Sequence, residues 1–182
     1  MSRQTQTGMP RHATGWLASR MNRTAWCDNR RVQVVVRRAR PDDQPVITAM
    51  VRRARLNPAG LHWEQFVVGE RDGRAVGVAQ LRRHPDGAKE LASLVVDPGA
   101  RGHGIAAQMV DALLAGETAA VYALIDRRFA GHFAHWDFRQ VDPSELPRSV
   151  SRTYLIGRTV TTLGSLLRRQ RIRIVPVLRP AR

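Results

Sequence analysis

The stretch ELASLVVDPGARGHGIAAQMVDALL, residues 90–114, decides the fold of this 182-residue chain. Its first seven residues are mostly apolar and are followed by Asp97-Pro98-Gly99, which predicts a buried strand that ends in a turn. Residues 104–114 then carry apolar side chains at helical spacing, and those expected to face inward are Ile105, Met109, Val110, Leu113 and Leu114. A strand that passes through a glycine-rich turn into a helix predicts an anion site, because the first amides of a helix lack partners.

Patterns on both sides of this stretch predict the rest of a mixed sheet. Before it, we expect strands over 32–36, 66–70 and 75–81, a helix near 44–54 and a hairpin turn at Asp72-Gly73. After it, we expect a strand over 119–125, a short helix over 129–136, a short strand over 138–141, a helix around 150–163 and a last strand over 172–178. Residues 82–88 are expected to form a loop, and Pro176 favours an edge or a bulge. This order predicts one α/β domain with a mixed, mostly antiparallel central sheet flanked by helices.

The positive charge of the chain lies at its two ends. The net charge is +15, with +8 in residues 1–40, −2 in residues 41–145 and +9 in residues 146–182. Residues 1–31 are polar and arginine-rich, so we interpret them as a flexible leader, a composition that transit peptides share, before a domain over 32–182. The arginine-rich ends leave nucleic-acid binding as an alternative function, although a single lysine among 30 basic residues points to genome composition.

The glycine turn has a rival interpretation. Gly102-x-Gly104-x-x-Ala107 matches the loose dinucleotide fingerprint, and Asp126 follows where a ribose-binding acid would stand. The spacing argues against this, because residues 97–101 separate the strand from the first glycine, whereas a dinucleotide turn follows its strand at once. A glycine-rich turn that binds no ligand is the third possibility.

Three segments carry a resemblance to a known family. Arg101-x-x-Gly104-x-Ala106 resembles the R/Q-x-x-G-x-G/A signature of the GNAT acetyltransferases. Residues 38–43, RARPDD, are similar to the first strand-to-helix junction of that family, and residues 132–138, HFAHWDF, to its late F-Y-x-x-x-G-F segment. The resemblance covers about residues 33–145 and implies the GNAT acyl-CoA N-acyltransferase fold, with acetyl-CoA as the donor and a primary amine as the acceptor.

The resemblance also implies where acetyl-CoA binds. The fourth and fifth strands of the family splay apart, and backbone groups of Leu94, Val95 and Val96 would pair with the pantetheine arm in the gap. Backbone amides of the turn would hold the pyrophosphate, and the residues implied are Arg101, Gly102, His103, Gly104, Ile105, Ala106 and Ala107. Because these contacts use the backbone, we expect His103 to be a solvent-facing loop residue.

Glu90 is the candidate catalytic base, since it begins the fourth strand, where several enzymes of the family place a glutamate. The structural alternative is a strand-edge carboxylate that pairs with Arg82 or Arg83. The tyrosine that usually protonates the departing CoA is replaced by Phe133, so water, Tyr122 or a nearby histidine would have to act instead. This replacement motivates a second hypothesis, a CoA-binding protein of the GNAT fold that has lost catalysis.

The acceptor is the least determined part of the prediction. Asn57, Trp63 and Phe66 fall where the family builds its acceptor site, although ordinary packing of a loop on the sheet is the favoured explanation for them. A small amine, an amino acid or a peptide would each fit, and a homodimer is possible. We expect no metal, since His132 and His135 lack a third ligand, and no cysteine nucleophile, since Cys27 lies in the leader. No apolar run is long enough to cross a membrane, and the single cysteine favours a cytoplasmic location.

Overall fold

The computed structural model describes residues 34–166 and 172–182. The chain divides into two units, Met1–Arg31 and Val32–Arg182, and all described residues belong to the second. The predicted leader over 1–31 lies outside the described residues.

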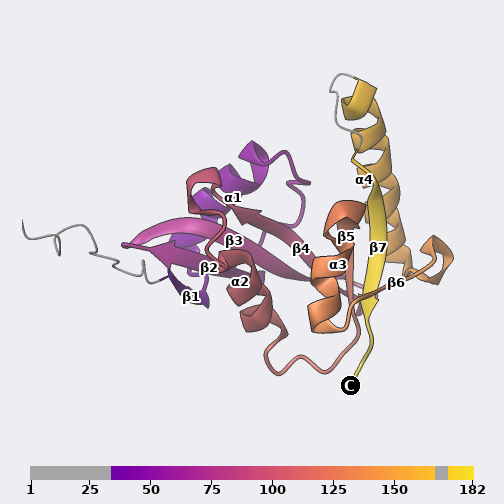
Figure 1. Ribbon diagram of the computed structural model, residues 1–182, viewed down its shortest axis with the longest axis horizontal. Coiled ribbons are helices and arrows are strands. Elements are labelled where there is room, and N and C mark those ends of the chain that lie inside the picture. The colour runs from indigo at the N-terminus through magenta and orange to yellow at the C-terminus, as the bar shows by residue number, and fades with distance from the viewer. Residues whose placement is uncertain (1–33, 167–171) are drawn as a thin grey trace, which may run out of the picture. The chain divides into compact units, whose positions relative to one another are not determined.

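The described residues of this unit form a mixed sheet whose strands lie in the order β1-β2-β3-β4-β5-β7-β6 (Figure 1). All neighbouring pairs are antiparallel except β4 and β5, which run parallel. The strands are β1 (Val34–Arg38), β2 (Phe66–Arg71), β3 (Arg74–Arg83), β4 (Lys89–Val96), β5 (Val121–Asp126), β6 (Arg139–Gln140) and β7 (Ile174–Arg179). The helices are α1 (Gln44–Arg53), α2 (Ile105–Leu114), α3 (Ala130–Phe133) and α4 (Arg148–Leu166). The predicted fold class is confirmed.

Helices cover both faces of the sheet, as the alternation of side chains along the strands requires. On β2, Val67 packs in the cluster that contains the inner side of α2, whereas Phe66 and Val68 pack in the cluster around α1. Phe133 of α3 belongs to the α2 cluster, while Tyr154 of α4 packs on the opposite face of β5 and β7. All five side chains of α2 that were expected to face inward are buried.

Several predicted boundaries differ from the observed ones. β3 extends to Arg83, so the predicted loop at 82–88 begins only at residue 84. Polar residues made the end of this strand resemble a loop, but Arg82 and Arg83 pair with Glu90 and Lys89 of β4. The first strand ends two residues later than predicted, at Arg38, because Arg37 and Arg38 continue the pairing with β2, and its first two predicted residues lie outside the described residues.

Pro176 lies in a strand that has neighbours on both sides, which corrects the prediction of a sheet edge. Its carbonyl oxygen accepts a hydrogen bond from the backbone N–H of Val141 at 3.2 Å. Since the N and O of one strand residue point to the same side, the missing N–H faces the short strand β6. The only ladder bond that proline removes is therefore the reciprocal one to Val141, directly beyond the two residues of β6, and the pairing of β7 with β5 keeps all its bonds.

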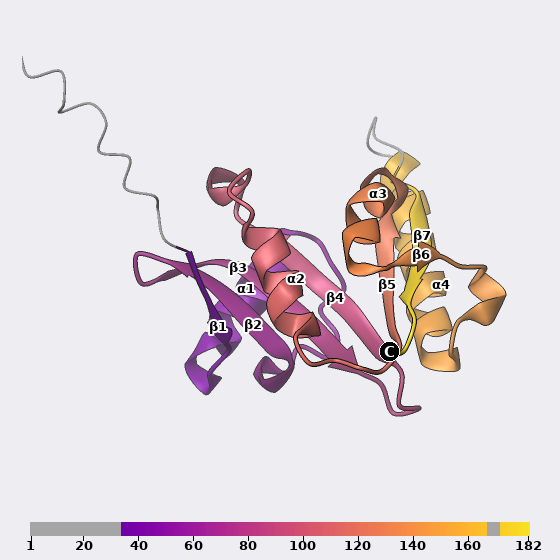
Figure 2. The same ribbon diagram turned by 60° about the horizontal axis from the view of Figure 1, so that its bottom comes forward.

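β4 and β5 are paired at one end and separate at the other. Their pairing joins Lys89, Glu90 and Leu91 to residues 121–123 and then stops, although both strands continue (Figure 2). The register between β3 and β4 shifts next to this point, and Ser93 has a left-handed backbone with φ of 52°. A bulge of this kind bends the strand that carries it, and among the described residues no strand pairs with residues 92–96 on the β5 side.

Candidate active site

The glycine turn joins the separated end of β4 to α2. Gly102 and Gly104 have φ values of 82° and 72°, a region that side chains with a Cβ rarely adopt. Arg101 donates from Nε to the carbonyl oxygen of Val96 at 3.1 Å, and the ring Nδ1 of His103 lies 2.8 Å from the carbonyl oxygen of Arg101. These contacts shape the turn, and Gly104 begins α2 with no side chain over its first amides.

Residues 94–96 line the separated part of β4. Val95 is buried in the α1 cluster, whereas Leu94 and Val96 are half-buried against the α2 cluster. Their side chains therefore pack into the two hydrophobic clusters. The side of the strand that faces β5 presents backbone N–H and C=O groups. This arrangement is compatible with the strand-like pairing expected for these three residues.

A buried polar cluster lies where β4 and β5 still pair. Glu90 is 2% exposed, and its Oε2 lies 2.8 Å from Nε2 of His84 and 3.6 Å from Nη1 of Arg82. Both contacts use the same oxygen, and within the described part of the chain Oε1 has no hydrogen bond. The expected pairing with Arg82 is observed, but β4 is an interior strand and Glu90 is not at a sheet edge.

The cluster continues along β3 to the loop that follows α1. Gln80 donates from Nε2 to the carbonyl oxygen of Gly60 at 2.6 Å, and Arg82 donates from Nη2 to that of Ala59 at 3.1 Å. Ser93 at the bulge donates to Gln80 at 3.3 Å. Nε of Arg82 is buried and has no hydrogen-bond partner among the residues that the structure describes. The loop that follows α1 is therefore held against the sheet by Gln80 and Arg82, and Arg82 also contacts Glu90.

Sequence reasoning missed His84 and Gln80. The available signal was the spacing of Gln80, Arg82 and His84, since alternate residues of a strand share one face. Three polar side chains at that spacing, beside a strand that is otherwise apolar, indicate a buried polar cluster on the sheet.

The three candidate acceptor residues differ in their surroundings. Asn57 is exposed, and its side-chain oxygen accepts a hydrogen bond from the N–H of Ala59 at 3.0 Å. Trp63 is half-buried against the α1 cluster. Phe66 is 0% exposed and packs in the α1 cluster, which favours the packing interpretation, because a side chain enclosed in the core presents no surface to an acceptor.

Phe133 is a core residue. It is 8% exposed and makes edge-to-face contacts with Trp136 and Phe138, at centroid distances of 5.8 and 5.6 Å.

Tyr122 pairs with Glu90 across β4 and β5, so the two side chains lie side by side on the face of the sheet opposite to Phe133.

The rival interpretations of the turn find little support. Asp126 accepts hydrogen bonds from the backbone and side chain of Arg128, and this guanidinium holds the pKa of Asp126 below its usual range. The carboxylate expected to bind a ribose is therefore already engaged.

Within the described residues, no group of three or more His, Cys, Asp or Glu side chains could hold a metal ion, and Cys27 lies outside them. No helix of the described part is long and apolar enough to cross a membrane.

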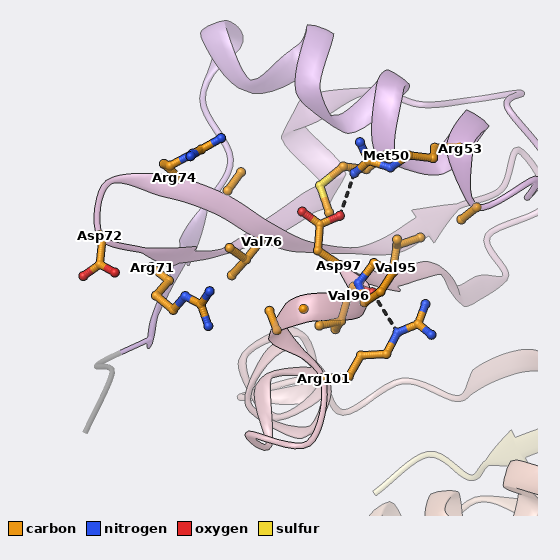
Figure 3. A pocket seen from close by; sticks show the side chains of 15 residues that line it. Met50, Arg53, Arg71, Asp72, Arg74, Val76, Val95, Val96, Asp97 and Arg101 are labelled. Carbon is orange, nitrogen blue, oxygen red and sulfur yellow. Dashed lines mark hydrogen bonds and ion pairs between the residues drawn. The ribbon is translucent and has the colours of Figure 1, made fainter. Parts of the chain in front are cut away.

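A pocket of about 640 Å³ lies at the far end of β4, between α1, the β2–β3 hairpin and the glycine turn (Figure 3). Its wall carries arginines from all three, and Arg53 pairs with Asp97 at 2.6 Å. Arg101 contributes to the wall of this pocket, but Glu90 does not line it.

Residues 22–132 match the model of the acetyltransferase (GNAT) family. The chain belongs to this family. A search of curated proteins found no match.

Solved structures of GNAT acetyltransferases share the fold. The N-acetylglutamate synthase of Neisseria gonorrhoeae, complexed with coenzyme A and N-acetyl-glutamate, matches with a TM-score of 0.62 and 22% identity over 82% of this chain. The match covers 35% of the synthase, so this chain spans about a third of that enzyme's length. Rv2747 of Mycobacterium tuberculosis, in complex with CoA and NLQ, matches with a TM-score of 0.59 and 26% identity, over 81% of this chain and 99% of its own.

A third structure is diaminobutyrate acetyltransferase of Paenibacillus lautus, in complex with L-2,4-diaminobutyric acid and coenzyme A. It matches with a TM-score of 0.55 and 16% identity, over 82% of this chain and 96% of its own. Identities this low establish the fold and leave the acceptor of this GNAT protein open.

Proposed function

We propose that this GNAT protein is an acetyl-CoA-dependent N-acetyltransferase that acts on a primary amine. The observation that carries the proposal is the separation of β4 from β5, with the glycine turn at one end and buried Glu90 at the other. An extended acyl thioester with an anionic end fits the gap between these strands. The unpaired backbone of β4 supplies hydrogen-bond donors and acceptors along the gap, and the first amides of α2 supply donors for the anionic end.

The residues proposed to hold the cofactor use their backbones. Residues 94–96 would pair with the pantetheine arm, and residues 101–107 would surround the pyrophosphate. The two left-handed glycines support this assignment, since neither carries a Cβ and Gly102 has no atom within 4 Å of the position that a Cβ would take.

Glu90 is proposed as the general base. The amine nitrogen forms a bond to the thioester carbon, the C–S bond breaks, and CoA leaves as a thiolate. Oε1 of Glu90 would accept the proton that the nitrogen loses, since Oε2 is engaged by His84 and Arg82. An alkyl ammonium has a pKa of about 10.4, so a base that removes its proton contributes at neutral pH.

Loss of the usual tyrosine acid does not prevent this reaction. A thiol has a pKa of about 8.5, so a CoA thiolate leaves readily at neutral pH. Tyr122, which is beside Glu90 on β5, or water could then supply the proton to sulfur.

The acceptor is proposed to be a small amine, with amino acids as the first class to test. Two of the similar structures are described with amino-acid ligands, N-acetyl-glutamate and L-2,4-diaminobutyric acid. The exposed loop that includes Asn57 and the half-buried Trp63 would border this acceptor. We further propose that the protein is located in the cytoplasm.

The second candidate is a CoA-binding protein without catalysis, which the buried Phe133 favours. A thermal shift assay with CoA, acetyl-CoA and NAD, followed by a thiol-release assay over a panel of amino acids, amines and peptides, tests both. Ligand at one hundred times its dissociation constant stabilises by about 2.7 kcal/mol, so CoA and acetyl-CoA should raise Tm and NAD should not. Thiol release with at least one amine supports the enzyme, whereas a CoA shift without turnover supports the second candidate. A shift with NAD alone would overturn both.

A further inference from the structure

His84 contacts Glu90 more closely than any other side chain in the described structure. The distance from Nε2 to Oε2 is 2.8 Å, and the side chains are 9% and 3% exposed. A hydrogen bond that is so short and so well shielded from water holds both groups in one orientation. His84 lies in the strand-end turn that leads from β3 to β4, and its backbone N–H donates to the carbonyl oxygen of Ala88 at 2.9 Å.

This contact restrains the proposed base. Arg82 forms an ion pair with the same oxygen at 3.6 Å, so two contacts hold Oε2, while Oε1 has no hydrogen bond within the described residues. Tyr122 is the neighbour of Glu90 across the pairing with β5, directly before the two strands separate. Because Oε2 is held at this point, Oε1 stays available to a substrate in the gap between β4 and β5.

From this geometry we propose that His84 is a positioning residue for the acetyl transfer. Its ring holds Oε2 of Glu90 and thereby aims Oε1 at the amine that attacks the thioester. The inference rests on the proposed function, and it assigns His84 no contact with the substrate. The proton passes from the amine nitrogen to Oε1, and the ring of His84 stays bonded to Oε2 throughout.

Two substitutions separate this role from simple packing. In His84→Gln, the side-chain amide places a donor about where the ring Nε2 stands, so the contact with Oε2 is kept. In His84→Ala, the contact is lost and Oε1 is no longer aimed. We expect His84→Ala to lower kcat about 10- to 100-fold with little change in the KM for acetyl-CoA, because loss of orientation at the reacting centre acts on the chemical step. His84→Gln should recover most of this loss.

A double-mutant cycle tests whether His84 acts through Glu90. In the Glu90→Gln background, His84→Ala should cause little further loss of kcat, since residues that act as one unit are not additive. Independent, multiplicative losses would overturn the proposal, and so would a His84→Ala enzyme with the kcat of the wild type.

Ser149→Ala is the matched control, because it tests whether a less ordered loop at residues 84–88 would by itself lower kcat. Ser149 donates to Asp86 from its backbone N–H and its hydroxyl, at 3.1 and 2.8 Å, and so ties the loop that contains His84 to α4. We expect this variant to keep the wild-type kcat, and an equal loss would show that loop order, not the contact with Glu90, is responsible. Failure of the proposed function is a separate outcome. A wild-type protein that acetylates no amine would overturn both proposals, whereas an active wild type with unaffected His84 variants would overturn this one alone.

Discussion

Arg37 and Asp43 form a two-pronged ion pair between β1 and the start of α1. Nη1 of Arg37 donates to Oδ2 at 2.7 Å and Nη2 to Oδ1 at 3.1 Å, while Nε donates to Glu70 at 2.8 Å. The backbone N–H of Arg40 donates to the same Oδ2 of Asp43 at 2.7 Å. The guanidinium of Arg37 thus joins β1 to β2 and to the start of the first helix, and the carboxylate of Asp43 fixes the junction that resembles the family motif.

Asp43→Asn should therefore destabilise the protein in a pH-dependent way. The hydrogen bonds from Arg37 hold the pKa of Asp43 below its usual value. The ion pair contributes fully above the unfolded value of about 3.9 and is lost as pH falls through the lower folded value. We expect a loss of about 1–3 kcal/mol at pH 7 that shrinks toward pH 3, measured by urea unfolding. Asp72→Asn, at an exposed left-handed turn position, should be neutral, and a pH-independent difference for Asp43→Asn would contradict the assignment.

Gly104→Ala should weaken CoA binding as well as stability. Gly104 and Gly116 both have φ of 72°, and an alanine there costs about 1–2 kcal/mol. A Cβ at Gly116 would meet nothing within 4 Å and lies beyond the end of α2, away from the turn. The two variants should melt at similar temperatures, but only Gly104→Ala should raise the Kd for CoA in calorimetry. Equal Kd values would mean that the turn does not hold the pyrophosphate.

Gly77→Ala should destabilise the packing of α2 on the sheet. A Cβ at Gly77 would lie 2.9 Å from Cε of Met109 and 3.2 Å from the carbonyl oxygen of Val95, and a flexible methionine can move but the backbone cannot. We expect a loss of about 1–3 kcal/mol in thermal unfolding. Gly131→Ala, where a Cβ meets nothing within 4 Å, should be neutral or slightly stabilising, and an unchanged Tm for Gly77→Ala would contradict the close contact.

Glu90→Gln should slow acetyl transfer at neutral pH by about 10²–10⁴-fold, because the amide cannot accept the proton. The difference should narrow as pH rises from 6 to 9, since more of the amine is then already deprotonated. CoA affinity should barely change, because the proposed cofactor contacts lie further along β4 and in the turn. A rate near that of the wild type across this pH range would remove Glu90 from the mechanism and leave it as the structural partner of Arg82.

Removal of residues 1–30 should leave the domain intact. We expect a chain that begins at Arg31 to melt within a few degrees of the full-length protein and to bind CoA with the same Kd. Loss of folded protein on truncation would instead mean that the leader contributes to the fold.

The sequence by itself determined those features that depend on local chemistry. The inward side chains of α2, the hairpin at Asp72-Gly73 and the glycine turn follow from periodicity and from backbone preferences, which neighbouring residues impose on one another. Only the tertiary structure decided that β7 lies between β5 and β6, that β4 leaves β5 after Leu91, and that His84 meets Glu90. The physical reason is that register, strand order and burial are set by contacts between distant segments. A polar residue such as His84 shows in sequence only that it can pair, whereas the packed sheet selects its partner.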